Sequence, residues 1–133
     1  MIVVDTNTIA YLYVQGQRTA QAEKVLIKDS EWAAPLLWRS EFVSVLAFCV
    51  RQKTLALDDA MLIAEEAQQF MRGGEFEVPP AQILRIASGS KCSSYECEFV
   101  ALAQSLQVPL ITSDKELLKD FPSIAISMEK FTT

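Results

Sequence analysis

Four carboxylates hold positions in this sequence from which they could carry out chemistry. Asp5 and Asp114 each follow a short apolar run typical of a buried strand. Glu41 lies in a segment that is otherwise almost entirely apolar, and Glu96 lies in the first turn of an expected helix. Open α/β sheets bind ligands where the carboxyl ends of parallel strands meet. We therefore expect the two aspartates at one edge of a sheet, on which the two glutamates can converge.

An oxygen-only set of ligands favours a hard divalent ion. Mg²⁺ or Mn²⁺ prefers carboxylate oxygens, and carboxylates that hold such ions can activate a water and clamp a phosphodiester for in-line displacement. Without a metal, four close carboxylates would repel one another, and some would take up protons. The four acids therefore predict a site for Mg²⁺ or Mn²⁺.

Other chemistries are excluded by composition. The sequence contains no histidine, which excludes His-ligated zinc and catalysis by Ser-His-Asp or Cys-His groups. Its three cysteines, Cys49, Cys92 and Cys97, form no C-x-x-C pair. We expect them to be reduced structural thiols.

Asp5, Glu96 and Asp114 also have a structural interpretation as acids that stabilise the start of a helix. Asp5 could cap the turn into the first helix. Ser93-x-x-Glu96 and Ser113-x-x-Glu116 both match the capping box, in which a hydroxyl and a carboxylate satisfy backbone N–H groups at a helix start. With Ser113 as the cap, Asp114 would be an ordinary acid in the first turn of its helix.

The expected helix Leu36–Lys53 has almost no polar face. A helix that is apolar all round is buried, either in the core or in a subunit interface. Glu41 and Ser44 belong to its one narrow polar strip. A lone carboxylate there needs a partner, and the structural alternative to a metal is Arg39 or Arg51 from a neighbouring chain.

Hydrophobic periodicity and turn residues divide the chain into alternating strands and helices. The expected strands are Ile2–Val4, Trp32–Ala34, Glu75–Val78, Val108–Ile111 and Ile124–Ile126. The expected helices are Thr8–Val14, Thr19–Lys28, the apolar helix begun by Pro35, Leu57–Met71, Ala81–Ala87, one from Ser93 or Ser94 to Leu106, and one from Asp114 that ends before Pro122. With no linker or repeat between them, these elements predict one α/β domain over residues 1–133 with a mainly parallel sheet.

The composition is that of a globular protein with an acidic balance. Half of the 133 residues are apolar and 22% are charged, with 12 basic against 17 acidic side chains and a net charge of −5. This balance disfavours nonspecific nucleic-acid binding unless a bound divalent ion inverts the local charge. No apolar run approaches a membrane span or a signal peptide, so we expect a cytoplasmic protein without membrane contact. Scattered candidates for RNA contacts are Arg39, Arg51, Lys53, Lys91 and Lys115.

Four sequence segments together resemble the PIN-domain family. They are Ile-Val-Val-Asp-Thr-Asn at the start, the Glu of the apolar helix after Pro35, Ser-Ser-Tyr-Glu-Cys-Glu-Phe-Val-Ala-Leu-Ala, and Pro-Leu-Ile-Thr-Ser-Asp-Lys-Glu-Leu-Leu. The resemblance covers the whole chain in order and spacing. It is strongest to the small VapC-like toxins of type II toxin–antitoxin pairs.

The resemblance implies a three-layer α/β/α sandwich around a five-stranded parallel sheet. It also implies Mg²⁺- or Mn²⁺-dependent endoribonuclease activity that leaves a 5′-phosphate and a 3′-hydroxyl, a homodimer, and inhibition by a cognate antitoxin. By position, the metal-binding and catalytic acids would be Asp5, Glu41, Glu96 and Asp114. Asn7 and Thr112 fall beside them as supporting groups.

One position departs from the family pattern and supports an alternative function. The family usually has Asp where this chain has Glu96, and the extra methylene moves the carboxylate by roughly 1.5 Å. A PIN-like protein- or RNA-binding module with a weak or inactive metal site is therefore the alternative. A third class, a phosphotransferase with Asp5 as nucleophile, would want a second Asp where Asn7 stands, and the chain has no Gly-rich phosphate loop.

Overall fold

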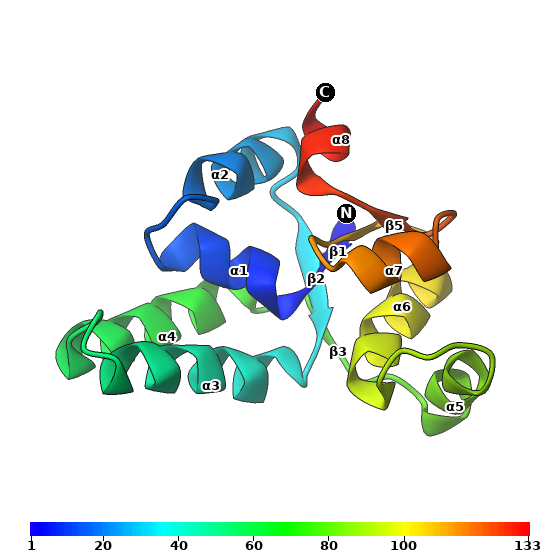
Figure 1. Ribbon diagram of the computed structural model, residues 1–133, viewed down its shortest axis with the longest axis horizontal. Coiled ribbons are helices and arrows are strands. Elements are labelled where there is room, and N and C mark those ends of the chain that lie inside the picture. The colour runs from blue at the N-terminus through cyan, green and yellow to red at the C-terminus, as the bar shows by residue number, and fades with distance from the viewer.

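A central parallel sheet organises the protein, whose computed structural model describes all residues 1–133 (Figure 1). Its five strands lie in the order β3-β2-β1-β4-β5, and every neighbouring pair is parallel. The strands are β1 (Ile2–Val4), β2 (Trp32–Pro35), β3 (Glu75–Phe76), β4 (Leu110–Ile111) and β5 (Ala125–Ile126). The strand nearest the start of the chain therefore occupies the centre of the sheet.

Helices cover both sides of the sheet. They are α1 (Thr6–Tyr13), α2 (Thr19–Lys28), α3 (Trp38–Arg51), α4 (Leu57–Met71), α5 (Pro80–Ser88), α6 (Ser94–Leu106), α7 (Lys115–Asp120) and α8 (Met128–Thr132). In Figure 1, α1 to α4 lie to the left of the sheet, and α5, α6 and α7 lie to the right. The predicted three-layer α/β/α architecture with a five-stranded parallel sheet is confirmed.

The central strand is apolar on both faces because both faces are covered. Ile2, Val3 and Val4 are all buried, with at most 2% of their surface exposed. β1 pairs with β2 on one side and with β4 on the other. This arrangement places the residues that follow β1 and β4 next to each other at one edge of the sheet.

Helix α3 is not buried on all sides within this chain, so burial in the core, one of the two alternatives predicted for it, is wrong, and burial in a subunit interface stays a prediction. Only Trp38, Phe42 and Leu46 are buried, one residue in every four along the helix. Val43 and Phe48 are 52% and 62% exposed, because α3 packs against α1 and α4 with one stripe only. The start was also misplaced: Pro35 is the last residue of β2, and the helix begins at Trp38.

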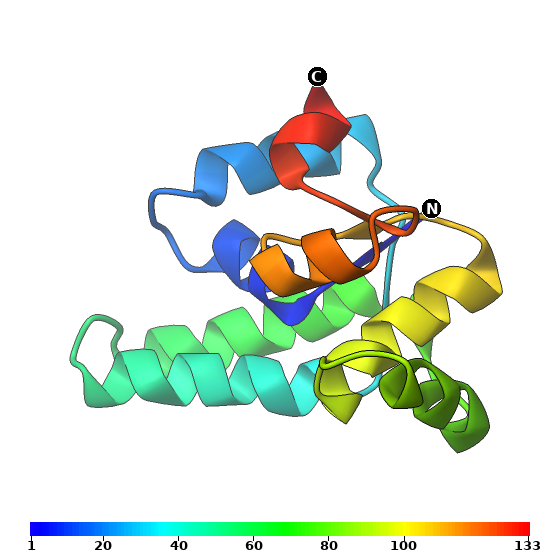
Figure 2. The same cartoon turned by 45° about the vertical axis from the view of Figure 1, so that its right-hand side comes forward.

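Helix α8 was not predicted. It is capped by Ser127, whose hydroxyl accepts the Lys130 N–H, and its Met128 is buried. It packs on α2, where Gln21 donates to Thr132 Oγ1 at 2.7 Å, and both views show the two helices together (Figures 1 and 2). A helix of five residues is too short to show a 3.6-residue period.

The turn into β3 depends on two glycines. Gly73 has a positive φ of 88°, which ends α4 in the left-handed region. Gly74 passes so close to β2 that a Cβ there would lie 2.1 Å from the carbonyl oxygen of Trp32. The Gly74 carbonyl accepts the Ala34 N–H, which begins the pairing of β3 with β2.

None of the eight helices is both long and apolar enough to cross a bilayer.

Candidate active site

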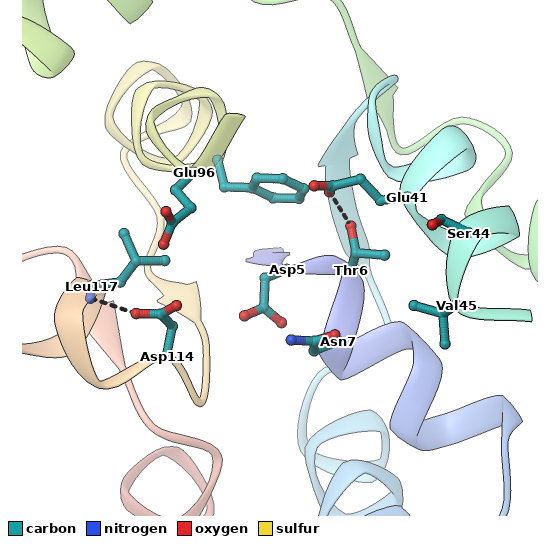
Figure 3. A pocket seen from close by; sticks show the side chains of 10 residues that line it. Asp5, Thr6, Asn7, Glu41, Ser44, Val45, Glu96, Asp114 and Leu117 are labelled. Atoms are coloured by element: carbon teal, nitrogen blue, oxygen red, sulfur yellow. Dashed lines mark hydrogen bonds between the residues drawn. The ribbon is translucent and has the colours of Figure 1, made fainter. Parts of the chain in front are cut away.

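The four acids singled out in the sequence line one cavity at the carboxyl edge of the sheet. Asp5 follows β1, Asp114 follows β4, Glu41 lies in α3 and Glu96 lies in the first turn of α6. The cavity has a volume of about 330 Å³, and Figure 3 shows the four carboxylates around it. Its remaining lining residues are Thr6, Asn7, Ser44, Val45, Phe99 and Leu117.

Asp5 is held by three donors. Its Oδ1 accepts the Thr8 backbone N–H at 2.9 Å and the Thr8 hydroxyl at 2.7 Å, and its Oδ2 accepts the Thr112 hydroxyl. Asp5 is therefore the N-cap of α1, so the structural interpretation also applies. Burial raises the pKa of the Asp5 carboxyl, and these hydrogen bonds act in the opposite direction.

The Thr112 hydroxyl connects two of the acids. It donates to Asp5 and accepts the backbone N–H of Asp114 at 3.0 Å. Thr112 is fully buried, so its hydroxyl has no competing water. The ends of β1 and β4 are thereby fixed relative to each other.

Glu41 has a hydroxyl partner rather than a basic one. Its Oε1 accepts the hydroxyl of Thr6 at 2.7 Å, shown as a dashed line in Figure 3. Burial raises the pKa of Glu41, the Thr6 bond opposes this, and the nearby charges of Asp5 and Glu96 raise it further. Arg39, one of the two arginines considered as a partner, instead pairs with Glu75 of its own chain. The sequence reasoning did not identify Thr6 as a partner.

Glu96 serves as a capping group while it lines the cavity. Its Oε1 accepts the Ser93 N–H at 3.2 Å and the Ser93 hydroxyl at 2.9 Å, and Ser93 Oγ accepts the Glu96 N–H at 3.1 Å. The predicted capping box at the start of α6 is confirmed. The longer glutamate side chain can reach back to the cap and still leave Oε2 without a protein donor.

Asp114 also caps a helix with one oxygen. Its Oδ1 accepts the N–H groups of Glu116 and Leu117 at 2.9 and 3.0 Å, whereas no protein group donates to Oδ2. The predicted Ser113-x-x-Glu116 capping box is therefore wrong, because α7 begins one residue later than that box requires. Ser113 Oγ is buried and has no hydrogen-bond partner.

Two other polar residues lie near the acids without bonding to them. Asn7 is exposed on the cavity lining, and its side chain makes no hydrogen bond to the four carboxylates. Glu98 lies outside the lining. Burial raises its pKa, and the charge of Glu41 adds to that effect. Residues two apart on a helix face different directions, so Glu98 does not replace Glu96.

The donor set of the cavity fits a hard divalent cation. None of the four carboxylates forms an ion pair with a lysine or arginine. A partly buried carboxylate without a cationic partner is costly, and the raised pKa values of Asp5 and Glu41 reflect that cost. Oxygen ligands without a basic partner are what Mg²⁺ or Mn²⁺ would take. No three of these acids bring ligand oxygens within 4.8 Å of one another, so the carboxylates line the cavity rather than form a closed cluster.

A second group of ligand atoms lies outside this cavity. Cys92 Sγ and carboxylate oxygens of Glu116 and Asp120 all lie within 4.8 Å of one another. Burial raises the pKa of the Cys92 thiol to about 11, with the charges of Glu96 and Asp120 contributing, so the sulfur carries a proton at neutral pH. Glu116 and Asp120 are exposed, and exposed acidic groups of this kind are common without a metal. All three cysteines are free thiols, as predicted.

Comparison with known proteins identifies the family. The sequence model of the PIN domain matches residues 2–122, which is most of the chain. The protein belongs to the PIN domain family. Ribonuclease VapC3 from Pyrobaculum aerophilum is 29% identical over 127 residues, covering 92% of this chain and 96% of that protein. The resemblance inferred from the sequence motifs is confirmed.

Solved structures of similar proteins share the PIN fold of this chain. PAE2754 from Pyrobaculum aerophilum aligns with a TM-score of 0.78 and 22% identity, covering 98% of this chain and 92% of its own. FitAcB from Neisseria gonorrhoeae gives 0.75 and 16%, with 97% and 99% covered. A toxin–antitoxin complex from Klebsiella pneumoniae gives 0.71 and 15%, with 96% and 98% covered. At these identities the likeness concerns the fold.

Proposed function

We propose that this PIN-domain protein is a metal-dependent endoribonuclease and the toxin of a type II toxin–antitoxin pair. The observation that carries the proposal is the cavity lined by Asp5, Glu41, Glu96 and Asp114. These acids come from four different elements, and none is neutralised by a basic side chain. The relative named Ribonuclease VapC3, similar over nearly the whole chain, supports the same activity.

The four acids would hold Mg²⁺ or Mn²⁺, which when bound supplies charge neutralisation at the phosphate and a more acidic water. Thr8 and Thr112 orient Asp5, and Thr6 orients Glu41. In the reaction a water oxygen forms a bond to phosphorus and the bond from phosphorus to the 3′-oxygen breaks. The 3′-oxygen receives a proton, so the products are a 5′-phosphate and a 3′-hydroxyl.

Asp114 and Glu96 keep one oxygen each for the cavity. Asp114 Oδ1 and Glu96 Oε1 are occupied by backbone and hydroxyl donors of their own helix starts. Each carboxylate is thereby fixed in orientation with its second oxygen free of protein donors. Such preorganisation lowers the cost of arranging the ligands when the ion and the substrate bind.

Partners of the proposed toxin are an RNA substrate, a cognate antitoxin and a second copy of the chain. An antitoxin is favoured by the structural neighbours, one of which is described as a toxin–antitoxin complex. A homodimer is favoured by the apolar face formed by the exposed side chains of α3 and α4. Val43, Leu57 and Met61 line an apolar groove on this face and are all more than half exposed.

The alternative is a PIN-like module that binds protein or RNA with little catalysis. The observation that favours it is the capping box of Glu96, whose Oε1 is committed to Ser93. A carboxylate that caps a helix has less freedom to close around an ion. Poor Mn²⁺ affinity in a well-folded protein would favour this alternative over the nuclease.

The decisive experiment is RNA cleavage with a structured RNA mixture in Mg²⁺, Mn²⁺ or EDTA. Asp5→Asn serves as the inactive variant, and Asp59→Asn, an exposed acid in the first turn of α4, is the matched control. We expect cleavage by the parent and by Asp59→Asn with either metal, none in EDTA and none by Asp5→Asn. Equal cleavage by Asp5→Asn would overturn the assignment of the site.

Mn²⁺ calorimetry distinguishes the two proposals if no cleavage is found. A selective nuclease binds Mn²⁺ in the parent and loses that binding in Asp5→Asn. A binding module without a metal site shows no difference between the two proteins. The circular dichroism spectrum of each variant confirms that the fold is kept.

A further inference from the structure

A nuclease with this acidic cavity needs positive charge nearby. RNA binding depends on phosphate contacts with lysine and arginine, and this protein has a net charge of −5. Two of its arginines are already paired, Arg18 with Glu129 and Arg39 with Glu75. Basic groups available to RNA must therefore come from elsewhere on the surface.

Three lysines line one hollow beside α7, the helix whose start also lines the acidic cavity. Lys91, Lys115 and Lys119 line this lysine hollow, which has a volume of about 510 Å³. All three side chains are exposed, and no carboxylate lies within 4.0 Å of their ammonium groups. Lys91 and Lys115 were scattered candidates in the sequence, and the fold brings them together with Lys119.

The lysine hollow and the acidic cavity lie on two faces of the same short helix. Asp114 and Leu117, at the start of α7, line the cavity. Lys115 and Lys119 are four residues apart on α7 and line the hollow. Lys91 faces them from the loop before α6, and the thiol of Cys92 in that loop donates to Asp120 at 3.7 Å. An RNA strand that extends from the cavity across α7 would therefore reach these lysines next.

The charge of the lysine hollow suits an anion better than a cation. Glu116 and Asp120 also line it, so the three lysines leave one net positive charge. The Cys92 thiol donates to Asp120 at 3.7 Å, so this carboxylate already has a partner within the hollow. Flexible lysines form sequence-independent contacts with a polyanion, as phosphate contacts require.

We propose that the lysine hollow binds the sugar-phosphate backbone of the RNA strand that flanks the phosphate in the acidic cavity. The proposal rests on the proposed ribonuclease function, since it names the path of that substrate. It assigns the lysines to affinity and not to bond cleavage. Their loss should weaken RNA binding and leave the metal site intact.

The test compares two triple variants in the inactive Asp5→Asn background. The first removes the three positive charges of the hollow with Lys91→Gln, Lys115→Gln and Lys119→Gln. The control changes the same charge on exposed lysines elsewhere, with Lys24→Gln, Lys28→Gln and Lys130→Gln. Fluorescence anisotropy with a labelled single-stranded RNA gives Kd at several salt concentrations for each protein.

We expect the hollow variant to bind RNA more weakly and with a smaller salt dependence. Each lost phosphate contact should reduce the slope of log Kd against log salt by about 0.7, as for single strands. The control variant should keep the slope of the Asp5→Asn parent. Equal slopes and equal affinities for the two triple variants would overturn the proposal.

A variant that should tighten RNA binding keeps the test informative even if the triple variant fails to fold. Glu116→Gln removes an exposed carboxylate from the lysine hollow, so it should tighten RNA binding. Unchanged or weaker binding by Glu116→Gln would count against the proposal. Cleavage assays with Asp5 intact distinguish failure of the nuclease function from failure of the lysine hollow as an RNA-binding site. If the protein binds RNA through the lysine hollow but does not cleave it, the nuclease function is refuted and the RNA-binding site is retained.

Discussion

Hydroxyl groups, rather than basic side chains, orient the carboxylates of this site. Thr6, Thr8 and Thr112 are buried and donate to Glu41 or Asp5. A hydroxyl fixes an oxygen without neutralising it, so the charge needed to attract a cation is kept. A lysine or arginine in the same place would form an ion pair and compete with the metal.

Thr6→Val should therefore impair metal binding without unfolding the protein. Valine has the same shape as threonine but cannot donate to Glu41 Oε1, which accepts the Thr6 hydroxyl at 2.7 Å. Loss of a partner that supports a metal ligand typically costs about 10- to 100-fold in metal affinity or activity. We expect a change of that size in Mn²⁺ affinity by calorimetry and in kcat of RNA cleavage.

Thr6→Ser is the matched control, because it keeps the hydroxyl and removes only a methyl group. It should restore Mn²⁺ binding to near the parent value. A serine variant as impaired as the valine variant would show that packing, and not the hydrogen bond, explains the loss.

Glu41→Gln should stabilise the metal-free protein at neutral pH. Burial raises the pKa of Glu41 above its ordinary value of 4.5, so the folded protein binds this proton more tightly than the unfolded chain. The stability from this group is fully present below that ordinary value and is lost as the pH rises through the raised pKa. The neutral glutamine avoids this loss and can still accept the Thr6 hydroxyl.

The measurement is urea denaturation of the parent and Glu41→Gln in EDTA at pH 7.5 and near pH 4. We expect the variant to have the higher midpoint at pH 7.5 and the difference to shrink at the lower pH. Glu65→Gln, an exposed acid on α4, should show neither effect. A Glu41→Gln variant that is less stable than the parent at pH 7.5 would contradict the cost assigned to the buried charge.

The positions of the four acids and the local capping partner of Glu96 could be predicted from the sequence. The distant hydroxyl partner of Glu41 could not, and Thr112 was placed beside the acids only by the family resemblance. Asp5 and Asp114 follow apolar runs, and that pattern is local. The Thr6 to Glu41 bond joins residues 35 apart, and the Thr112 to Asp5 bond joins residues 107 apart. Which hydroxyl reaches which carboxylate depends on the packing of α1, α3 and β4, which no local pattern contains.

At the level of elements, the close approach of Gly74 to β2 determines how the edge of the sheet is built. Gly74→Ala would place a Cβ 2.1 Å from the Trp32 carbonyl oxygen, so the two strands must separate. We expect a loss of about 1–3 kcal/mol in the free energy of unfolding, the usual range for overpacking. Chemical denaturation measures this directly.

Gly73→Ala is the control for that prediction. No atom lies within 4 Å of a Cβ at Gly73, but its φ of 88° disfavours any side chain. Its cost should be about 1–2 kcal/mol, from backbone conformation alone. Only Gly74→Ala should weaken hydrogen-exchange protection of the Ala34 N–H, which donates to the Gly74 carbonyl. Equal exchange in both variants would contradict the steric explanation.

The alternation of strands and helices could be predicted because each strand is a short apolar run bounded by turn residues. Two errors have a common physical reason. Of the two kinds of burial predicted for the apolar helix α3, burial in the core was wrong, because this chain supplies partners for one stripe only. Helix α8 was missed because its burial against α2 depends on contacts distant in sequence, such as that of Gln21 with Thr132.

At the scale of the whole molecule, the exposed apolar face of α3 and α4 should mediate the proposed homodimer. Met61 is 55% exposed and lines a groove with Val43 between these helices. Met61→Glu should convert a dimer into monomers in sedimentation velocity, since it would bury an unpaired charge in the interface. Glu65→Lys, which changes an exposed charge of α4 outside the groove lining, should leave the dimer intact. A monomeric parent would refute the homodimer.

The order of strands also has a consequence for the timing of activity in the cell. Asp5 is synthesised more than a hundred residues before its partner Thr112 and the fourth acid Asp114. The acidic cavity can form only after β4 has been synthesised and has paired with the central strand β1. For a ribonuclease, this means that an unfinished chain on the ribosome cannot cut the message that encodes it. A chain that ends before β4 lacks Thr112 and Asp114, so it should form no acidic cavity and should not cleave RNA.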